Sequence, residues 1–137
     1  MKVSNKADYA IHAMVYIAAM NKAQFSTIDQ VAENAKVPRQ YLAKILKELV
    51  DGGLLRSYRG FYGGYKLAKP GSKISFLNII EAIDGPLQVI SCADDRHARK
   101  GHIKRKYCIG QVFWIPLQDK LKETLRHMTL DKLGEFE

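Results

Sequence analysis

One stretch, from Pro38 to Leu67, constrains the fold of this chain more than any other. Its first half predicts a helix, because apolar side chains recur there at spacings of three and four residues. These are Leu42, Ile45, Leu46 and Leu49. Pro38 suits the first turn of such a helix, where its missing N–H has no partner to lose. Gly52 and Gly53 are typical of the end of a helix.

The opposite face of this helix would carry long hydrogen-bond donors and one aromatic ring, rather than carboxylates. They are Arg39, Gln40, Tyr41, Lys44 and Lys47. Residues 54–58 and 64–67 then predict two short strands around a glycine-rich tip. The sequence therefore predicts a mostly α fold with a small β-hairpin wing, a winged helix-turn-helix. In that layout the helix enters the major groove of DNA, and the wing reaches the backbone or the minor groove.

The residue types on the predicted helix suggest how it would contact double-stranded DNA. Arginine pairs with guanine and glutamine with adenine, so we expect Arg39, Gln40 and Lys44 to face the groove. Tyr41 would stack or reach a phosphate, and Lys47 would contact the backbone.

In the wing, Arg59 would enter a narrow minor groove, with Arg56 and Tyr62 on phosphates. Gly60 would let the hairpin approach DNA closely. Tyr62 and its neighbour Phe61 have a plainer alternative, which is to pack against the base of the wing. Lys2 and Lys6, near the start of the chain, would neutralise phosphates.

The positive charge is unevenly placed along the 137 residues. The net charge is +8, and residues 1–73 hold 12 Lys and Arg against 5 Asp and Glu. The remaining residues are nearly neutral. A basic half joined to a neutral half indicates a polyanion-binding module attached to another element.

Helices are also predicted on both sides of this stretch. Ser4 or Asn5 would cap a helix ending near Met20, and Ser26 would begin a second one, with Asp29 completing a capping box. Ser75 would cap a later helix that stops at residues 84–86. We divide the chain into a winged helix-turn-helix domain (1–85), a cysteine-bearing loop (86–108) and a C-terminal dimerisation helix (109–137).

The last helix would run from Ile109 to about His127, with Pro116 either kinking it or marking its true beginning. Its apolar stripe consists of Leu117, Leu121, Leu125 and Met128. A long helix beyond the winged domain is expected to pack on a second copy of the chain, which predicts a homodimer.

Other classes of protein fit the sequence less well. No apolar run reaches the length of a membrane span and no signal peptide is evident, so we expect a cytoplasmic protein. No catalytic motif argues for an enzyme. An interaction adaptor that does not bind DNA would be expected to replace Arg39, Lys44 and Arg59 with acidic or apolar residues, and all three are basic.

The chain resembles the bacterial Rrf2 family of winged-helix transcriptional regulators along nearly its whole length. The resemblance lies in the opening KVSNKADYAIHAM, the helix YLAKILKEL, the wing LLRSYRGFYGGYKLAKP, the segment ISFLNIIEAIDGP and the closing TLDKL. It implies a homodimer crossed by the C-terminal helices, which binds a partly palindromic DNA operator. Many members carry an iron–sulfur cluster in the loop before the last helix, held by three cysteines and often by a non-cysteine ligand from the partner.

This chain departs from that pattern, because Cys92 and Cys108 are its only cysteines. The resemblance places Cys108 at the last family cysteine, His102 near the missing middle one and Asp8 at the acidic fourth ligand. A 2Fe-2S cluster would then use Cys92, Cys108, His102 or alternatively His97, and Asp8 of the partner subunit. Zinc on the four loop residues Cys92, His97, His102 and Cys108 is a second possibility. A loop that binds no metal, as in cluster-free family members, is the third.

Overall fold

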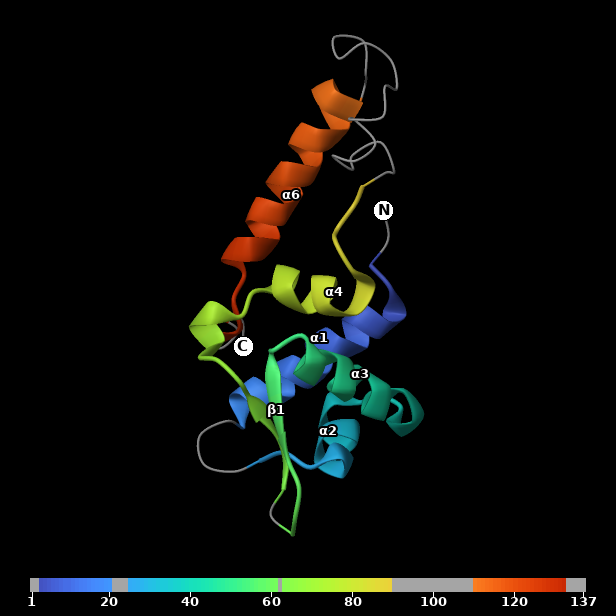
Figure 1. The fold of residues 1–137 in the computed structure, drawn as a ribbon, viewed down its shortest axis with the longest axis vertical. Coiled ribbons are helices and arrows are strands. Elements are labelled where there is room, and N and C mark those ends of the chain that lie inside the picture. The colour runs from blue at the N-terminus through green and yellow to red at the C-terminus, as the bar shows by residue number, and fades with distance from the viewer. Residues whose placement is uncertain (1–2, 21–24, 62, 90–109, 133–137) are drawn as a thin grey trace.

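The computed structural model describes residues 3–20, 25–61, 63–89 and 110–132 (Figure 1). Its elements in chain order are α1 (Asn5–Ala19), α2 (Ile28–Ala35), α3 (Arg39–Asp51), β1 (Leu55–Tyr58), β2 (Gly64–Leu67), the 3-10 turn η1 (Gly71–Lys73), α4 (Phe76–Asp84), the π-helical turn η4 (Gly110–Trp114) and α6 (Ile115–His127). The two strands pair as an antiparallel hairpin. This confirms the predicted fold, a helical domain with a small wing followed by a long helix.

The core lies where α1, α2 and α3 meet, and the apolar stripe predicted for α3 is confirmed. Its four members, Leu42, Ile45, Leu46 and Leu49, are completely buried. On α1 the buried face is made mainly of small side chains, Ala7, Ala10 and Ala13, with Met14 and Ile17. Because alanines let helix backbones approach closely, α1 packs against α2, α3 and α4 at once.

Side-chain caps fix where the helices begin. The Ser4 hydroxyl accepts a hydrogen bond from the Ala7 N–H at 3.0 Å, so Ser4 caps α1. The expected start of the second helix was wrong by one residue. Thr27 is the N-cap of α2 and Gln30 completes the capping box, because these two side chains bond each other's backbone N–H groups. The Asp29 carboxylate therefore takes no part in the capping box and is available to another partner.

The wing is held to the helical core by a short backbone pairing. Leu55 and Leu67 face each other across the hairpin and are both buried. The connection before α2 adds a bridge, since Ser26 and Tyr65 exchange two backbone hydrogen bonds of 2.9 and 2.8 Å. Gly64 permits this close approach: at φ 152° a Cβ there would lie 2.4 Å from the Ser26 carbonyl oxygen.

The last helix rises away from α1, α2, α3 and the wing, with α4 between them and α6 (Figure 1). The helix α6 begins at Ile115, after the turn η4, and Pro116 lies in its first turn. Of the two alternatives given for Pro116, the structure therefore confirms that it marks the beginning of the helix. The expected first residue, Ile109, lies outside the described residues. The other end of α6 returns to the domain, where the Phe76 N–H donates to the Met128 carbonyl at 2.8 Å. Among the described helices, none has the length and apolar character that crossing a bilayer requires.

Candidate nucleic-acid interface

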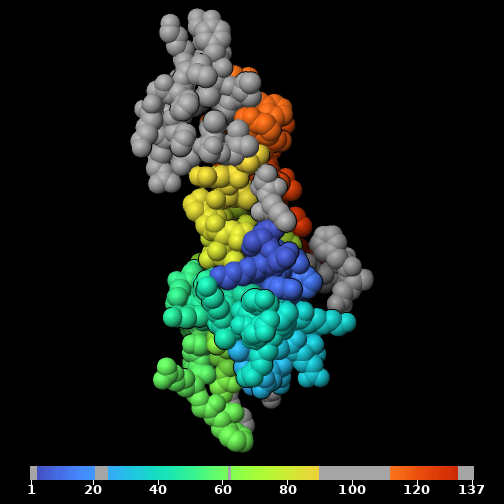
Figure 2. All heavy atoms as spheres, turned by 90° about the vertical axis from the view of Figure 1, so that its right-hand side faces the viewer, coloured from blue at the N-terminus to red at the C-terminus, as the bar shows by residue number. Residues whose placement is uncertain are grey.

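The face of α3 opposite the buried leucines is open to solvent. Its exposed side chains before Glu48 include three cations and no carboxylate. The six exposed side chains in this part of the helix are those of Arg39, Gln40, Tyr41, Ala43, Lys44 and Lys47. The first turns of α1 lie beside α3 on the surface shown in Figure 2, and the wing projects below them. Burial of one face of α3 thus presents a cationic face next to the wing.

Arg39 has a partner that the sequence did not predict. Its Nε lies 3.0 Å from Oδ1 of Asp29 on α2, and the two side chains are 61% and 75% exposed. An ion pair so open to water contributes between about 0 and 1 kcal/mol, so a nucleic acid can displace Asp29 easily. Because Asp29 and Arg39 are ten positions apart on different helices, only the packing of α2 on α3 shows that they meet.

The wing combines cations with an aromatic cluster near the tip end of its strands. Arg56 on β1 lies directly opposite Lys66 on β2. Like charges placed opposite each other destabilise a hairpin, so a phosphate between them would relieve that repulsion. Lys66 also places its Nζ 5.6 Å from the centroid of the Phe25 ring, and Tyr58 packs on the same ring with centroids 4.1 Å apart.

The tip of the wing carries Arg59, Gly60 and Phe61, all exposed. Gly60 has φ 119°, a conformation that favours glycine, and its carbonyl accepts the Gly63 N–H at 3.0 Å. Phe61 is 95% exposed, which excludes the alternative in which it packs on the base of the wing. Tyr62 lies outside the described residues, as does Lys2.

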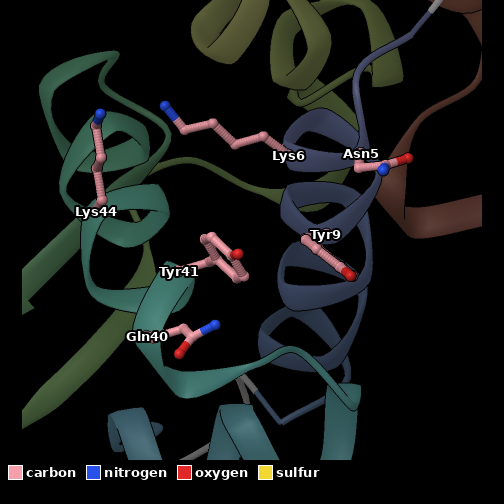
Figure 3. Close-up of a pocket in the computed structure, with 6 residues that line it drawn as sticks. All are labelled: Asn5, Lys6, Tyr9, Gln40, Tyr41 and Lys44. Atoms are coloured by element: carbon pink, nitrogen blue, oxygen red, sulfur yellow. The ribbon is translucent and has the colours of Figure 1, made fainter.

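A groove of about 390 Å³ separates the first turns of α1 from α3. Asn5, Lys6 and Tyr9 line it from α1, and Gln40, Tyr41 and Lys44 line it from α3 (Figure 3). The rings of Tyr9 and Tyr41 are nearly parallel, with centroids 6.3 Å apart. In Figure 3 the side chains of Gln40 and Tyr41 extend from α3 toward α1, and the ammonium groups of Lys6 and Lys44 lie at one end of the groove. The groove therefore has two cations and two amides in its lining and no carboxylate.

Lys6 is held by a carboxylate beneath the groove. Its Nζ lies 2.6 Å from Oε1 of Glu48, and the two side chains are 34% and 29% exposed. The other oxygen, Oε2 of Glu48, is buried and accepts no hydrogen bond from the described residues. The sequence singled out Lys6 as a cation but gave no sign of this pairing, because 42 residues separate the partners.

The expected metal ligands fall mostly where the structure gives no description. Cys92, His97, His102 and Cys108 lie outside the described residues. Asp8 is on α1 with its side chain 64% exposed, and the His12 imidazole lies 3.5 Å from its Oδ1. Within the residues that are described, no three His, Cys, Asp or Glu side chains come together as a metal site.

The apolar stripe predicted for the last helix is divided between two environments. Leu121 and Leu125 pack on Leu77, Ile80 and Leu87, so part of the stripe covers α4 rather than facing a second copy. Other large apolar side chains in this region remain exposed, by between 39% and 69%. They are Val112, Phe113, Leu117 and Met128.

A three-helix core with the wing after α3, and an exposed cationic face on α3 itself, defines a winged helix-turn-helix protein of the DNA-binding kind. The profile of the Rrf2 family, described as iron-dependent transcriptional regulators, matches residues 3–135. The chain belongs to the Rrf2 family. The model of this family describes transcriptional regulators, and the relatives named below are regulators of the same kind.

Known relatives and solved structures agree with this assignment. An HTH-type transcriptional regulator of Mycobacterium tuberculosis is 42% identical over 87 residues, which cover 64% of this chain and 54% of that protein. The match thus spans only about half the length of this mycobacterial relative. The structure of CymR, the global cysteine regulator of B. subtilis, has a TM-score of 0.80 at 25% identity and covers 100% of this chain and 98% of that one. The structure of T. potens IscR has a TM-score of 0.76 at 26% identity, with coverage of 100% and 89%.

Proposed function

We propose that this regulator is a homodimer that reads a partly palindromic operator through α3 and the wing. The exposed face of α3 from Arg39 to Lys47, which carries three cations and no carboxylate, is the observation that carries the proposal. Arg39 reads bases in the major groove, and Lys47 contacts the backbone. Gln40 extends toward α1 in the free protein, so it reads a base only after its side chain rotates. Arg59 at the tip of the wing enters the minor groove, with Arg56 and Tyr62 on phosphates.

Dimerisation is supported by the apolar side chains that α6 and η4 leave exposed. Val112, Phe113, Leu117 and Met128 lie outside the hydrophobic cluster that joins α6 to α4. Contact with the same surface of a second copy would remove them from water and generate a two-fold axis. Such an axis matches two DNA half-sites at a fixed spacing.

The signal is proposed to act at the loop of residues 86–108. The donor set fits a 2Fe-2S cluster: thiolates from Cys92 and Cys108, an imidazole from His102 or His97, and a carboxylate from Asp8 of the partner subunit. Such a cluster supplies a redox change, whose potential nitrogen and oxygen ligands shift. Asp8 is exposed and therefore available to a partner. It also lies on α1, whose first turn is bonded to α3 through Lys6 and to α4 through Ser4 and Asp84. A bond from Asp8 across the dimer would therefore fix the angle between the two winged domains.

A second candidate is a regulator without a cluster, which responds to a small molecule or to the thiol state, or which binds zinc. The likeness to CymR, which is described as a global cysteine regulator, supports a response to a small molecule or to the thiol state. The family resemblance implies three cysteines in members that bind a cluster, and this chain has only two.

Two measurements test these proposals. Selection from a random duplex library should enrich a partly palindromic sequence, and a failure to enrich any sequence would contradict operator reading. Anaerobically purified protein should show visible charge-transfer absorption, with iron and sulfide near one cluster per subunit, and Cys92→Ser should remove both. A colourless protein that contains zinc would favour the four loop residues as ligands. A colourless, metal-free protein that resists cluster reconstitution would leave the cluster-free regulator.

A further inference from the structure

Apart from Gln40, the groove between α1 and α3 is lined by groups whose chemistry suits an oxyanion. Two ammonium groups, from Lys6 and Lys44, line it together with the Tyr41 side chain, which is 52% exposed. The near-parallel ring of Tyr9 supports Tyr41 from the α1 side. Ammonium and phenol groups are donors that phosphate oxygens accept, and they carry no information about base sequence.

The position of the groove identifies which oxyanion it would meet. It lies along the side of α3 that faces α1 (Figure 3), and α3 also carries the exposed Arg39 and Lys47. A helix inserted in the major groove has the sugar–phosphate backbone on its flanks, so side chains along its edge meet phosphates. A neighbouring helix that supplies donors to the same edge adds to that contact.

One feature of the groove works against strong binding. The Lys6 ammonium lies 2.6 Å from Oε1 of Glu48, so its charge is largely neutralised in the free protein. Lys44 forms no ion pair with any of the described residues and remains exposed. The second oxygen of Glu48 accepts no hydrogen bond from the described residues, so the carboxylate is not fully satisfied by Lys6 alone.

We propose that the α1–α3 groove seats one backbone phosphate of the operator on Lys44 and Tyr41, and that Glu48 limits its strength by neutralising Lys6. This inference rests on the proposed placement of α3 in the major groove. It assigns Lys44 to positioning rather than base reading, and it gives a carboxylate on the recognition helix a role in keeping DNA affinity low.

The test is a salt titration of binding to a 30-base-pair duplex of mixed sequence, because a phosphate contact does not depend on sequence. Each phosphate neutralised contributes about −0.9 to the slope of log K against log salt concentration. Lys44→Met should therefore make the slope shallower by about 0.9, and Tyr41→Phe should weaken binding with little change in slope. Glu48→Gln frees Lys6, so it should steepen the slope by up to about 0.9 and tighten binding at low salt. Lys120→Met, which removes an exposed cation from α6, is the matched control and should leave the slope unchanged.

The outcomes separate this inference from the proposed function. Wild-type protein that shows no salt-dependent binding would overturn the DNA-binding placement of α3, and the groove with it. Normal wild-type binding with unchanged slopes for both Lys44→Met and Glu48→Gln would overturn the groove proposal alone. Inorganic phosphate, added at constant ionic strength, provides a further arm. If it displaces the duplex from wild type but not from Lys44→Met, the duplex occupies the groove as proposed. If phosphate binds through Lys44 without displacing the duplex, the groove is a site for free phosphate, which would overturn a role in holding DNA.

Discussion

Replacing Lys6 by methionine should destabilise the protein more than replacing its partner Glu48 by glutamine. Lys6→Met removes the donor 2.6 Å from Oε1 of Glu48, and Oε2 already accepts no hydrogen bond from the described residues. Both oxygens of a carboxylate that is 29% exposed would then have no donor among the described residues. An orphaned buried acceptor costs about 1–3 kcal/mol, and breaking a fully buried ion pair about 3–5 kcal/mol. Partial exposure of this pair lets water compensate, so we expect a loss of about 2 kcal/mol.

Glu48→Gln leaves the Lys6 ammonium without its carboxylate partner. The Lys6 ammonium sits on a flexible stem and can turn toward water, and the new amide oxygen can still accept its hydrogen bond. The expected loss is therefore below about 1 kcal/mol. The double variant Lys6→Met, Glu48→Leu, which removes both charged groups, should recover most of the stability lost in Lys6→Met.

Urea denaturation followed by circular dichroism measures these differences, with every variant at the same protein concentration in case the chain dimerises. A loss of 2 kcal/mol corresponds to a fall in Tm of about 6–8 °C for a chain of this size. Either of two results would show that the loss of stability does not come from an unpaired Glu48 carboxylate. In the first, Glu48→Gln is destabilised as much as Lys6→Met; in the second, the double variant is no more stable than Lys6→Met. The assignment of an under-satisfied Glu48 would then be refuted.

Three further predictions concern DNA reading, the wing and the dimer. Arg59→Ala should reduce both the affinity and the specificity of binding to the selected operator, whereas Lys47→Ala should mainly make the salt dependence of binding shallower. If both variants bind the operator like the wild type in a salt titration, the proposed interface is wrong. Gly64→Ala should cost at least about 2 kcal/mol in urea denaturation, because its Cβ would clash with the carbonyl of Ser26, and an unchanged midpoint would disprove that close approach. Phe113→Asp should shift the protein toward monomer in light scattering, since this ring is 53% exposed beside α6, and an unaffected dimer would place the interface elsewhere.

Local features of the fold followed directly from the sequence. The stripe on α3 was predictable because the helical period of 3.6 residues places Leu42, Ile45, Leu46 and Leu49 on one side. The start of α4 was predictable because a serine hydroxyl in front of an apolar run satisfies free N–H groups, as Ser75 does. The cap of α2 was missed by one residue, since Ser26 and Thr27 offer the same hydroxyl. Only the backbone pairing of Ser26 with Tyr65 decides between them.

The last helix shows a second limit of periodicity. Its pattern located an apolar stripe but did not say what the stripe would contact. In the folded chain Leu121 and Leu125 are covered by α4, while Leu117 and Met128 stay exposed. Period identifies a face that avoids water, and the neighbour that covers it depends on where α4 lies.

The sequence by itself determined where the α-helices and the two strands form, the cationic character of α3 and the family to which the chain is similar. These properties depend on residues close together in the chain, where hydrogen bonding, turn chemistry and period act locally. The tertiary structure alone decided that Lys6 meets Glu48, that Asp29 meets Arg39, and that two helices enclose a cationic groove. Those contacts join residues far apart in the chain. They depend on the distance and angle at which helices pack, which the residues of one helix do not specify.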